Sequence, residues 1–408
     1  MIDSNYSNKC MWQINSYNFA STGNIMIGIS EVARARGWKV YTSCPAARTM
    51  YQHKLKDHIY IGSILSRSIH RLISNYTGIH GIGSYFATKR FLSKVERTKP
   101  KVIHLHNLHG SYIHLPLLFR FIKSHPDIQV VWTLHDCWAF TGNCPHFIML
   151  DCEQWKTQCR QCAYEGYPKG RIDQTSKMYK FKKRWFTGCR NLTIVTPSKW
   201  LANLTKQSFL SEYPVTVIYN GINTEIFSPG YPDIRNKYGI EMSKFIILGV
   251  SFSWGYRKGL DVFLKLASLL PNEFQIILVG ISEEQKSDLP GNMITIPKTN
   301  NLEELAAIYS SADVFLNPTR EDNFPTVNLE ALACGVPVLT FDTGGSPEAI
   351  NQNTGMIVNE NNLSEVLQSL KTHNFKKSDC ITRGREFAAE KKYLEYINLY
   401  NDLLREKG

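Results

Sequence analysis

The chain alternates short apolar runs with longer stretches in which apolar residues recur at helical spacing. In the first half, the runs that predict strands span 11–15, 38–42, 101–106, 129–134, 191–196 and 215–219. In the second half they span 245–250, 275–280, 293–296, 313–316 and 336–341. Helical spacing predicts helices at 24–36, 177–190, 260–270, 302–310, 326–334 and 382–404. Strands that alternate with helices over short connections build parallel sheets, so the pattern predicts an α/β fold.

The length of the chain indicates more than one domain. Its 408 residues, 43 % of them apolar and 20 % charged, describe a globular protein too large for one ordinary core. A Pro- and Gly-containing stretch at 229–232 separates the two sets of predicted strands and reads as a linker. We therefore expect an N-terminal domain over 1–220, a C-terminal domain over 221–385 and a final helical segment over 386–408.

The loop between the predicted strand 313–316 and the predicted helix 326–334 carries the densest chemistry. Asp322 stands before the helix, and Glu330 lies eight residues later, about one turn inside it. Ligands of open α/β sheets bind where a strand ends and a helix begins, and a helix N-terminus offers free N–H groups to an anion. An acid that caps the helix and a solvated acid on the helix face would also place acidic residues at these two positions. The interpretation of the pair therefore depends on the residues around it.

Those surroundings resemble a known signature. Asn-Phe-Pro-Thr between the two acids and Gly-Val-Pro after them are similar to the acid-x7-acid motif of retaining GT-B glycosyltransferases of family 4. The resemblance implies two Rossmann-like domains that face each other across a cleft, with a last helix that crosses back to the first domain. It also implies that the second domain binds a nucleotide-sugar, UDP- or GDP-linked.

The resemblance assigns roles to the residues of this loop. Asp322 and the loop amides would hold the donor sugar, and Glu330 would bind the ribose hydroxyls. The donor-binding residues carried over are Asn323, Phe324, Pro325, Thr326 and Glu330. The first acid of the family is usually Glu, so Asp322 is one methylene shorter, and its neighbour Glu321 lies out of register.

A second loop between a strand and a helix carries Arg257 and Lys258 before a glycine. Adjacent cations at such a loop are commonly surface residues, but the resemblance implies that Lys258 binds the nucleotide diphosphate. The family commonly has an arginine six residues before this lysine, where this chain has Phe252, so Arg257 is the candidate for the missing charge. Because no Asp-x-Asp motif is present, we expect cations and helix N-termini, rather than a catalytic metal or another cofactor, to stabilise the leaving group.

Two candidates lie in the first half. His135 follows the strand 129–134 in a Thr-Leu-His-Asp context similar to that of the family histidine that touches the donor sugar. Gly23 lies in a small-residue turn between the first strand and the first helix, and this turn resembles the glycine loop of the family. Gly23 is therefore a candidate for contact with the donor. The expected catalytic residues are His135, Asp322, Lys258 and Arg257.

Five of the ten cysteines crowd into an insertion at 137–162. Four of them include one Cys-x-x-Cys and could form a tetrahedral zinc site: Cys144, Cys152, Cys159 and Cys162. Free buried thiols and redox pairing are the alternatives, and the sequence leaves all three open. A similar cysteine-bearing loop, and the run His-Leu-His-Asn-Leu-His-Gly at 104–110, resemble the branch of the family that makes colanic-acid-like and other bacterial surface polysaccharides.

The charge of the chain is unevenly distributed. Residues 1–215 carry 29 Lys and Arg against 11 Asp and Glu, a net charge of +18, whereas residues 216–408 carry 18 against 24, a net charge of −6. The first half is therefore expected to face an anionic partner. Cations and aromatic residues are interleaved at 60–99 and 177–190, which fits lipid headgroups or ordinary solvated helix faces. Because no zinc finger, RNA-binding signature or basic zipper is present, we favour a membrane surface over nucleic acid.

These features together define the expected function. No apolar run approaches the ~18 residues that a membrane helix needs, and residues 1–10 lack a signal-peptide pattern, so we expect a cytoplasmic protein, peripheral on the inner membrane face, with reduced thiols. The resemblance implies retaining transfer of a sugar to a lipid-linked saccharide in capsule, O-antigen or exopolysaccharide synthesis. A sugar-nucleotide epimerase of the same fold is the alternative. A nucleic-acid-binding protein is a weaker one, because it has no use for the paired acids.

Overall fold

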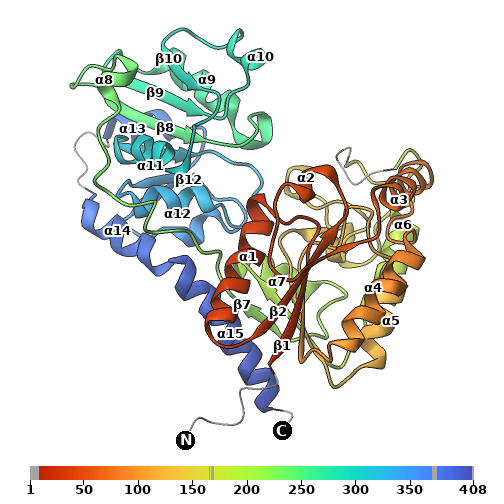
Figure 1. Ribbon diagram of the computed structural model, residues 1–408. Helices are drawn as coiled ribbons and strands as arrows, with labels where there is room; N and C mark the ends of the chain where they lie inside the picture. The colour runs from red at the N-terminus through yellow and green to blue at the C-terminus, as the bar shows by residue number, and fades with distance from the viewer. Residues whose placement is uncertain (1–8, 165, 167–169, 370–374, 407–408) are drawn as a thin grey trace, which may run out of the picture. The chain divides into compact units, whose positions relative to one another are not determined.

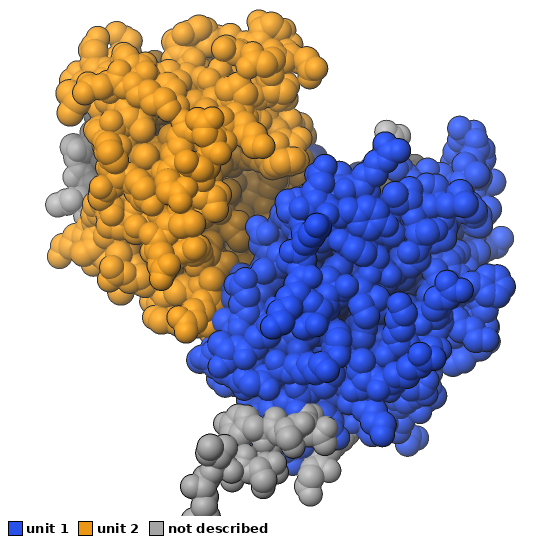
Figure 2. Space-filling view, viewed as in Figure 1, with its two compact units in different colours: residues 1–219, 392–408 blue, residues 220–391 orange. Residues whose placement is uncertain are grey.

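A computed structural model describes residues 9–164, 166, 170–369 and 375–406 (Figure 1). Contacts within the chain divide it into two compact units, coloured separately in Figure 2. Unit 1 comprises residues 1–219 and 392–408, and unit 2 comprises residues 220–391. Each unit is an α/β layer structure with its own parallel sheet, as the alternating pattern predicted.

Unit 1 is built on a seven-stranded sheet with the order β3-β2-β1-β4-β5-β6-β7. Its strands are β1 (Cys10–Ile14), β2 (Lys39–Pro45), β3 (His58–Ile61), β4 (Val102–Leu105), β5 (Gln129–Thr133), β6 (Leu192–Thr196) and β7 (Val215–Val217). Every residue of β1, β4, β5 and β6 is buried, as expected for central parallel strands covered on both faces. Since all pairs are parallel, the carboxyl ends of these strands meet at one edge.

Helices cover this sheet: α1 (Ala20–Ala35), α2 (Arg48–Tyr51), α3 (Ile64–Thr77), α4 (Tyr85–Arg97), α5 (Leu115–Ser124), α6 (Thr175–Phe186) and α7 (Lys199–Gln207). The core between sheet and helices includes the fully buried aromatic residues Trp12, Trp132, Phe119 and Phe186. Each such side chain contributes roughly 1.5–3 kcal/mol by leaving water. No helix in the described part of the chain is both long and apolar enough to cross a membrane.

Unit 2 has a six-stranded parallel sheet with the order β10-β9-β8-β11-β12-β13. The strands are β8 (Phe245–Val250), β9 (Phe274–Val279), β10 (Met293–Ile296), β11 (Val314–Asn317), β12 (Val338–Phe341) and β13 (Gly355–Val358). The helices are α8 (Arg235–Tyr238), α9 (Leu260–Leu269), α10 (Glu283–Lys286), α11 (Leu302–Ser310), α12 (Thr326–Ala333), α13 (Leu363–Ser369) and α14 (Lys377–Glu386). β8 and β11 are neighbours, so the loops that follow them lie side by side at the carboxyl edge.

Two strands were not predicted, and both are edge strands. In β3 only Ile61 is fully buried, and in β13 the side chain of Ile357 is half exposed. An edge strand with one protected face needs no continuous apolar run, so the hydrophobic pattern did not mark either segment.

The predicted single helix 382–404 is wrong, because two helices meet there. α14 ends at Glu386, and α15 (Ala389–Arg405) begins after a short break. In this break Ile222 donates its backbone N–H to Phe387 and accepts one from Ala389, so the backbone is held by the segment that follows β7. Most of α15 belongs to unit 1, where Tyr400 Oη contacts His104 Nδ1 at 2.7 Å.

Candidate active site

In unit 2 the predicted acid loop follows β11 and leads into α12. α12 begins after Pro325, whose fixed φ suits a helix entrance, and among the described residues no side chain caps its first turn. The backbone N–H groups of Thr326 and Val327, the first two residues of α12, can therefore face an anion, whereas that of Asn328 donates to the carbonyl of Pro325. Phe324 and Pro325 are buried, so the loop is anchored by apolar packing while its polar backbone borders the sheet edge.

An ion pair joins the two loops that the sequence singled out. Lys258 Nζ lies 2.5 Å from Asp322 Oδ2, and both side chains are about one-fifth exposed. Lys258 ends a 3-10 turn, Tyr256–Lys258, and Gly259 follows with φ +75°. A Cβ at Gly259 would lie 2.5 Å from the carbonyl oxygen of Pro318, so only glycine lets the two loops approach this closely.

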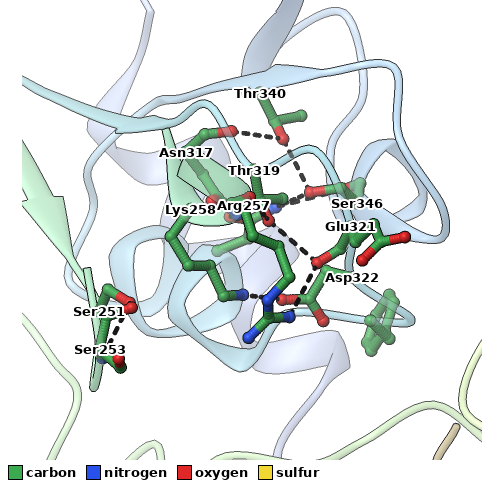
Figure 3. A network of polar contacts seen from close by, with 12 residues as sticks. Ser251, Ser253, Arg257, Lys258, Asn317, Thr319, Glu321, Asp322, Thr340 and Ser346 are labelled. Atoms are coloured by element: carbon green, nitrogen blue, oxygen red, sulfur yellow. Dashed lines mark hydrogen bonds and ion pairs between the residues drawn. The ribbon is translucent and has the colours of Figure 1, made fainter. Parts of the chain in front are cut away.

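Arg257 lies beside this pair but makes weaker contacts. Its Nη1 lies 3.4 Å from the backbone oxygen of Glu321, and its own carbonyl accepts the N–H of Arg320 at 2.9 Å. Figure 3 shows the Arg257 and Lys258 side chains directed toward the Asp322 loop. The structure therefore brings together Arg257, Lys258 and Asp322, predicted site residues from two loops that lie more than sixty positions apart in the sequence.

Arg320 braces the cationic loop, and sequence reasoning did not single it out. Its guanidinium pairs with Asp261, at 2.7 and 2.8 Å, and with Glu360, and it stacks 3.8 Å from the ring of Tyr256. Arg320 Nη1 also donates to the carbonyl of Tyr256 at 2.6 Å. Since two carboxylates already neutralise Arg320, it is a structural cation rather than a candidate for phosphate binding.

A buried polar network lies behind the acid loop (Figure 3). Asn317 Nδ2 donates to Asn328 Oδ1 at 2.8 Å, and Asn328 Nδ2 donates to Ser346 Oγ at 3.2 Å. Ser346 Oγ contacts Thr340 Oγ1 at 2.7 Å, and that hydroxyl also reaches the carbonyl of Asn317. These side chains tie the ends of β11 and β12 to α12, and buried networks of this kind hold one geometry.

Gly344 fixes the backbone of Asp322. Gly344 has φ +58°, and a Cβ at this position would lie 1.8 Å from the carbonyl oxygen of Asp322. The glycine turn after β12 was predicted, but its contact with the acid loop was not, because the two segments meet only in the folded sheet.

Glu330 lies on α12, partly buried, and accepts a hydrogen bond from Tyr309 Oη at 3.0 Å. Burial raises the pKa of Glu330 to about 7, although hydrogen bonds from Tyr309 and Thr326 oppose the shift. A carboxyl group with this pKa changes charge close to neutral pH. Tyr309 was not predicted, since a tyrosine on a helix gives no sign of its partner.

In unit 1, His135 follows β5 at the carboxyl edge of the sheet. Its Nε2 lies 3.0 Å from His106 Nδ1, and His106 Nε2 lies 2.9 Å from Gln13 Oε1. Burial lowers the pKa of His135 to about 4 and that of His106 well below its ordinary value, so both rings are neutral at pH 7. Gln13 Nε2 donates to the carbonyl of Met26 and to Ser30 Oγ. The Oε1 atom of Gln13 is therefore the atom that accepts from His106.

This chain of contacts sets the tautomers. His106 Nε2 must donate to Gln13, so His106 Nδ1 accepts and His135 Nε2 is the donor. His135 then carries its lone pair on Nδ1. His106 and Gln13 were missed as partners, because they lie on strands that the sequence separates by about ninety residues but the sheet places side by side.

Asp136, the next residue, pairs with His109, whose Nε2 lies 3.0 Å from Asp136 Oδ2. The other oxygen accepts the N–H of Trp138 at 2.8 Å. Burial acts to raise the pKa of Asp136, but the charge and hydrogen bond of His109 and the Trp138 amide outweigh it and lower the pKa. The Thr-Leu-His-Asp segment is therefore held rigidly at the end of β5.

Gly23 lies elsewhere than predicted. The first helix begins at Ala20 rather than at 24, so Gly23 is in the first turn of α1 and not in a turn before it. A Cβ at Gly23 would lie 2.9 Å from the carbonyl carbon of Asn18, so glycine permits the tight entrance to α1. Gly23 and His135 belong to unit 1, and the remaining predicted site residues belong to unit 2.

The cysteine-rich insertion folds around one cavity of about 220 Å³. Four thiols line it: Cys144, Cys152, Cys159 and Cys162. No disulfide joins the ten cysteines, and within the described residues no group of three or more His, Cys, Asp or Glu is arranged to hold a metal ion. The predicted zinc site is therefore not shown by the structure.

A buried cation lies close to these thiols. Lys182 is fully buried, and its Nζ donates to the carbonyls of Trp138, at 2.6 Å, and Thr141, at 3.2 Å. Burial lowers its pKa to about 7, while the nearby Cys144, Cys159 and Asp136 act in the opposite direction.

Comparison with known proteins decides what kind of site this is. Residues 23–226, half of the chain, match the family described as Glycosyltransferase Family 4, and residues 231–387 match Glycosyl transferases group 1. The chain belongs to glycosyltransferase family 4. The enzyme is a glycosyltransferase of the GT-B fold, and the resemblance inferred from the acid loop is confirmed.

Individual relatives support this assignment. The glycosyltransferase is 25 % identical to a putative colanic acid biosynthesis glycosyl transferase, WcaC, of Escherichia coli K12, over 74 % of this chain and 77 % of the relative. Its fold is similar to that of sucrose-phosphate synthase from Thermosynechococcus elongatus, with TM-score 0.72, 18 % identity and coverage of 98 % and 100 %. Anabaena HepE, solved in complex with UDP, gives TM-score 0.66, 14 % identity and coverage of 97 % and 100 %.

Proposed function

We propose that this glycosyltransferase moves a sugar from a UDP- or GDP-linked donor to a lipid-linked saccharide, with retention of anomeric configuration, in bacterial surface polysaccharide synthesis. The observation that carries the proposal is the Lys258–Asp322 pair, 2.5 Å across, at the carboxyl edge of the unit 2 sheet. A cation that binds phosphate and an acid that binds sugar hydroxyls must be neighbours if they share one sugar-phosphate donor. The relationship to a colanic acid enzyme supports the polysaccharide pathway.

In this proposal the donor is held by unit 2. Glu330 on α12 accepts hydrogen bonds from the ribose, and the loop at 323–326 packs against the sugar. Lys258 exchanges Asp322 for the donor diphosphate, which releases the carboxylate to accept a sugar hydroxyl. A dianionic ligand competes well for Lys258, because its ion-pair partner in the described part of the chain is a single, partly exposed carboxylate.

The chemistry then depends on charge placed where the leaving group forms. Lys258, Arg257 and the first amides of α12 stabilise the departing diphosphate, so the side chains present supply positive charge to it. His135, neutral and oriented by His106, hydrogen-bonds the donor sugar near its reacting carbon. The departing phosphate oxygen takes the proton of the acceptor on the same face, which gives retention.

The acceptor belongs to unit 1 in this proposal. Unit 1 carries the basic half of the chain, and a lipid-linked acceptor is presented at an anionic membrane surface. We therefore place the enzyme at the inner face of the membrane, where it associates peripherally, and we propose no nucleic-acid partner.

We also propose that the four thiols of this cavity bind a structural zinc ion, which requires them to move, because in the described residues they are not arranged around a metal position. Four thiolates supply the sulfur ligands that zinc favours, and the buried ammonium of Lys182 would offset part of their negative charge. Elemental analysis of the purified chain should give about one zinc per molecule. A metal-free preparation with four titratable thiols in this cavity would exclude it.

The proposed reaction is tested with a panel of nucleotide-sugars. Donor binding should raise the melting temperature, and one UDP- or GDP-sugar should outrank the rest. With that donor and a lipid-extract acceptor, proton NMR of the product should show the anomeric configuration of the donor. An epimerase would instead convert the nucleotide-sugar without an acceptor, and that result would replace the proposed function.

A further inference from the structure

The helix α3 is oriented with its polar side toward the protein. The residues of α3 that are fully buried are His70 and Ser74, both polar. Its apolar residues face outward instead, with Leu65 70 %, Leu72 57 % and Ile69 50 % exposed. A helix that only covers a globular core shows the opposite arrangement, so this apolar face lacks the partner that its composition suits.

The outward residues form one stripe. Leu65, Ile69, Leu72 and Tyr76 are separated by four, three and four positions, which places them on the same side of a helix. Phe86, at the start of α4, is 83 % exposed and lines a cavity of about 370 Å³ together with residues at the N-terminal end of α3. An exposed aromatic residue at the start of α4 therefore lies across this cavity from the N-terminal end of α3.

This orientation is fixed by contacts on the inner side. His70 Nδ1 lies 3.0 Å from Ser84 Oγ, and Ser111 Oγ donates to Ser74 Oγ at 3.4 Å. The backbone of Gly83 packs so closely on the His70 ring that a Cβ there would lie 2.4 Å from it. α3 also begins with a Ser63 capping box and ends at Gly78 in the left-handed conformation. α3 is thus locked with its apolar side out.

The charge around this face is one-sided. Between Asp57 and Glu96 the sequence contains five Lys and Arg and no acidic residue. Two of these cations, Arg90 and Lys94 on α4, line the same cavity as Phe86. An apolar helix face on a segment whose charged residues are all cations has the chemistry of helices that lie in the headgroup region of an anionic bilayer.

We propose that α3 is the membrane-inserting element of this enzyme, with the stripe Leu65, Ile69, Leu72 and Tyr76 in the acyl boundary of an anionic bilayer. The cations Arg71, Arg90 and Lys94 contact the lipid phosphates. The inference deepens the proposed function, because it assigns the membrane contact to one face of unit 1. α6, the other basic and aromatic segment, is the weaker candidate for insertion. It buries Met178, Tyr179 and Phe186, and its other two aromatic residues, Phe181 and Trp185, are partly buried.

The test is sedimentation with vesicles of phosphatidylcholine, alone or mixed with phosphatidylglycerol, at low and high salt. The parent chain should bind the anionic vesicles at low salt. The double variant Leu65→Ser/Leu72→Ser should lose at least tenfold in partitioning while keeping its melting temperature, because both side chains are exposed. Leu269→Ser, which changes a 54 % exposed leucine in unit 2, is the matched control and should bind as the parent does.

A second readout reports insertion directly. Leu72→Trp should show a blue shift of tryptophan emission with anionic vesicles, relative to the parent chain, and Leu269→Trp should show none. Unchanged vesicle binding by the double variant would overturn the proposal. So would self-association of the parent that the double variant abolishes without any lipid binding, because the face would then serve a second copy of the chain.

A measurement of donor binding distinguishes a failure of the membrane proposal from a failure of the proposed function. Thermal stabilisation by the nucleotide-sugar should be equal in the parent and in Leu65→Ser/Leu72→Ser. If the parent binds vesicles but no nucleotide-sugar, the proposed function fails and the assignment of α3 stands. If donor stabilisation is intact but vesicles are ignored, only the membrane assignment fails.

Discussion

The carboxyl edges of the two sheets carry different chemistry. In unit 2 the edge presents an ion pair, Lys258 with Asp322, that stays partly exposed. In unit 1 the edge presents the neutral rings of His106 and His135, joined at 3.0 Å and largely shielded from water. The same architecture thus offers charge where a diphosphate is proposed to bind and an uncharged hydrogen-bonding group where a sugar is proposed to lie. Buried histidines are the less costly choice for the second task, because a neutral ring avoids the desolvation penalty of a charge.

The largest effect is expected at the charged edge. Lys258→Met should lower turnover by about 10²- to 10³-fold, the usual loss when one group that stabilises a developing anion is removed. Steady-state kinetics with the identified donor would measure it, and Lys265→Met, on the exposed side of α9, should leave turnover unchanged. Equal losses of activity and melting temperature in Lys258→Met would instead give the pair a structural role.

The next effect separates the two adjacent acids. Asp322→Asn should lower kcat/KM by about 10-fold to 10²-fold, because a charge-assisted hydrogen bond to the sugar is worth about 1.5–3 kcal/mol. Glu321→Gln should cost less, because the Glu321 oxygen that lies 3.4 Å from Arg257 Nη1 belongs to the backbone and is kept in the variant. If Glu321→Gln is the more damaging change, the family role belongs to Glu321 and the register of the motif is shifted by one residue.

A smaller loss is expected at the neutral edge. His135→Ala should lower turnover by about tenfold, the size of one neutral hydrogen bond. Because burial lowers the pKa of His135 to about 4, the ratio of parent to variant activity should be constant between pH 6 and 8. A ratio that changes through pH 6.5 would show that the ring titrates normally. His125→Ala, at a histidine paired with Glu96 outside the edge, is the control.

The smallest effect is expected at Glu330 and is a dependence of donor affinity on pH. With its pKa at about 7, Glu330 is mostly protonated at pH 6 and ionised at pH 8, so donor affinity should rise by up to about tenfold over this range. Calorimetry would measure the rise, and Glu330→Gln should abolish it. The ribose role would be excluded if the variant binds the donor as the parent does at pH 8.

The same carboxyl group affects folding with the opposite sign. The folded pKa of Glu330 is above its unfolded value of roughly 4.3, so its contribution to stability is complete below pH 4.3 and is lost as the pH rises to about 7. The free energy of unfolding of the parent should therefore fall over this window relative to Glu330→Gln. Denaturant titrations at pH 5 and pH 8 would measure the difference.

Local sequence patterns were enough to select the candidate residues of the site. His135 closely follows an apolar run, Asp322 and Lys258 lie in loops after such runs, and Glu330 lies in the helix after the Asp322 loop. Buried strands are recognisable from sequence because their apolar runs are continuous. The hydrogen-bond partners of these residues could not be predicted from the sequence. Tyr309 for Glu330 and His106 for His135 come from other elements, and only the order of strands in the sheet brings them together.

The helices α3 and α6 of unit 1 also differ in a way that the sequence does not predict. Both are rich in cations and in apolar or aromatic residues, so either could be placed on a membrane from sequence alone. In the structure α6 buries Met178 and Phe186, whereas α3 buries His70 and Ser74. Amphipathic spacing tells which residues share a side of a helix, but not which side meets the protein.

The sequence by itself therefore determined the α/β architecture, the two cationic and acidic loops and the family, because these depend on residues close together in the chain. The tertiary structure alone decided the Lys258–Asp322 contact, the tautomer of His135, the break between α14 and α15 and the outward face of α3. Each of these depends on groups far apart in sequence, whose meeting is set by strand order and by the close packing of glycines such as Gly83 and Gly344. The periodicity of apolar residues does not predict contacts between different elements, since it depends only on neighbours within one helix or strand.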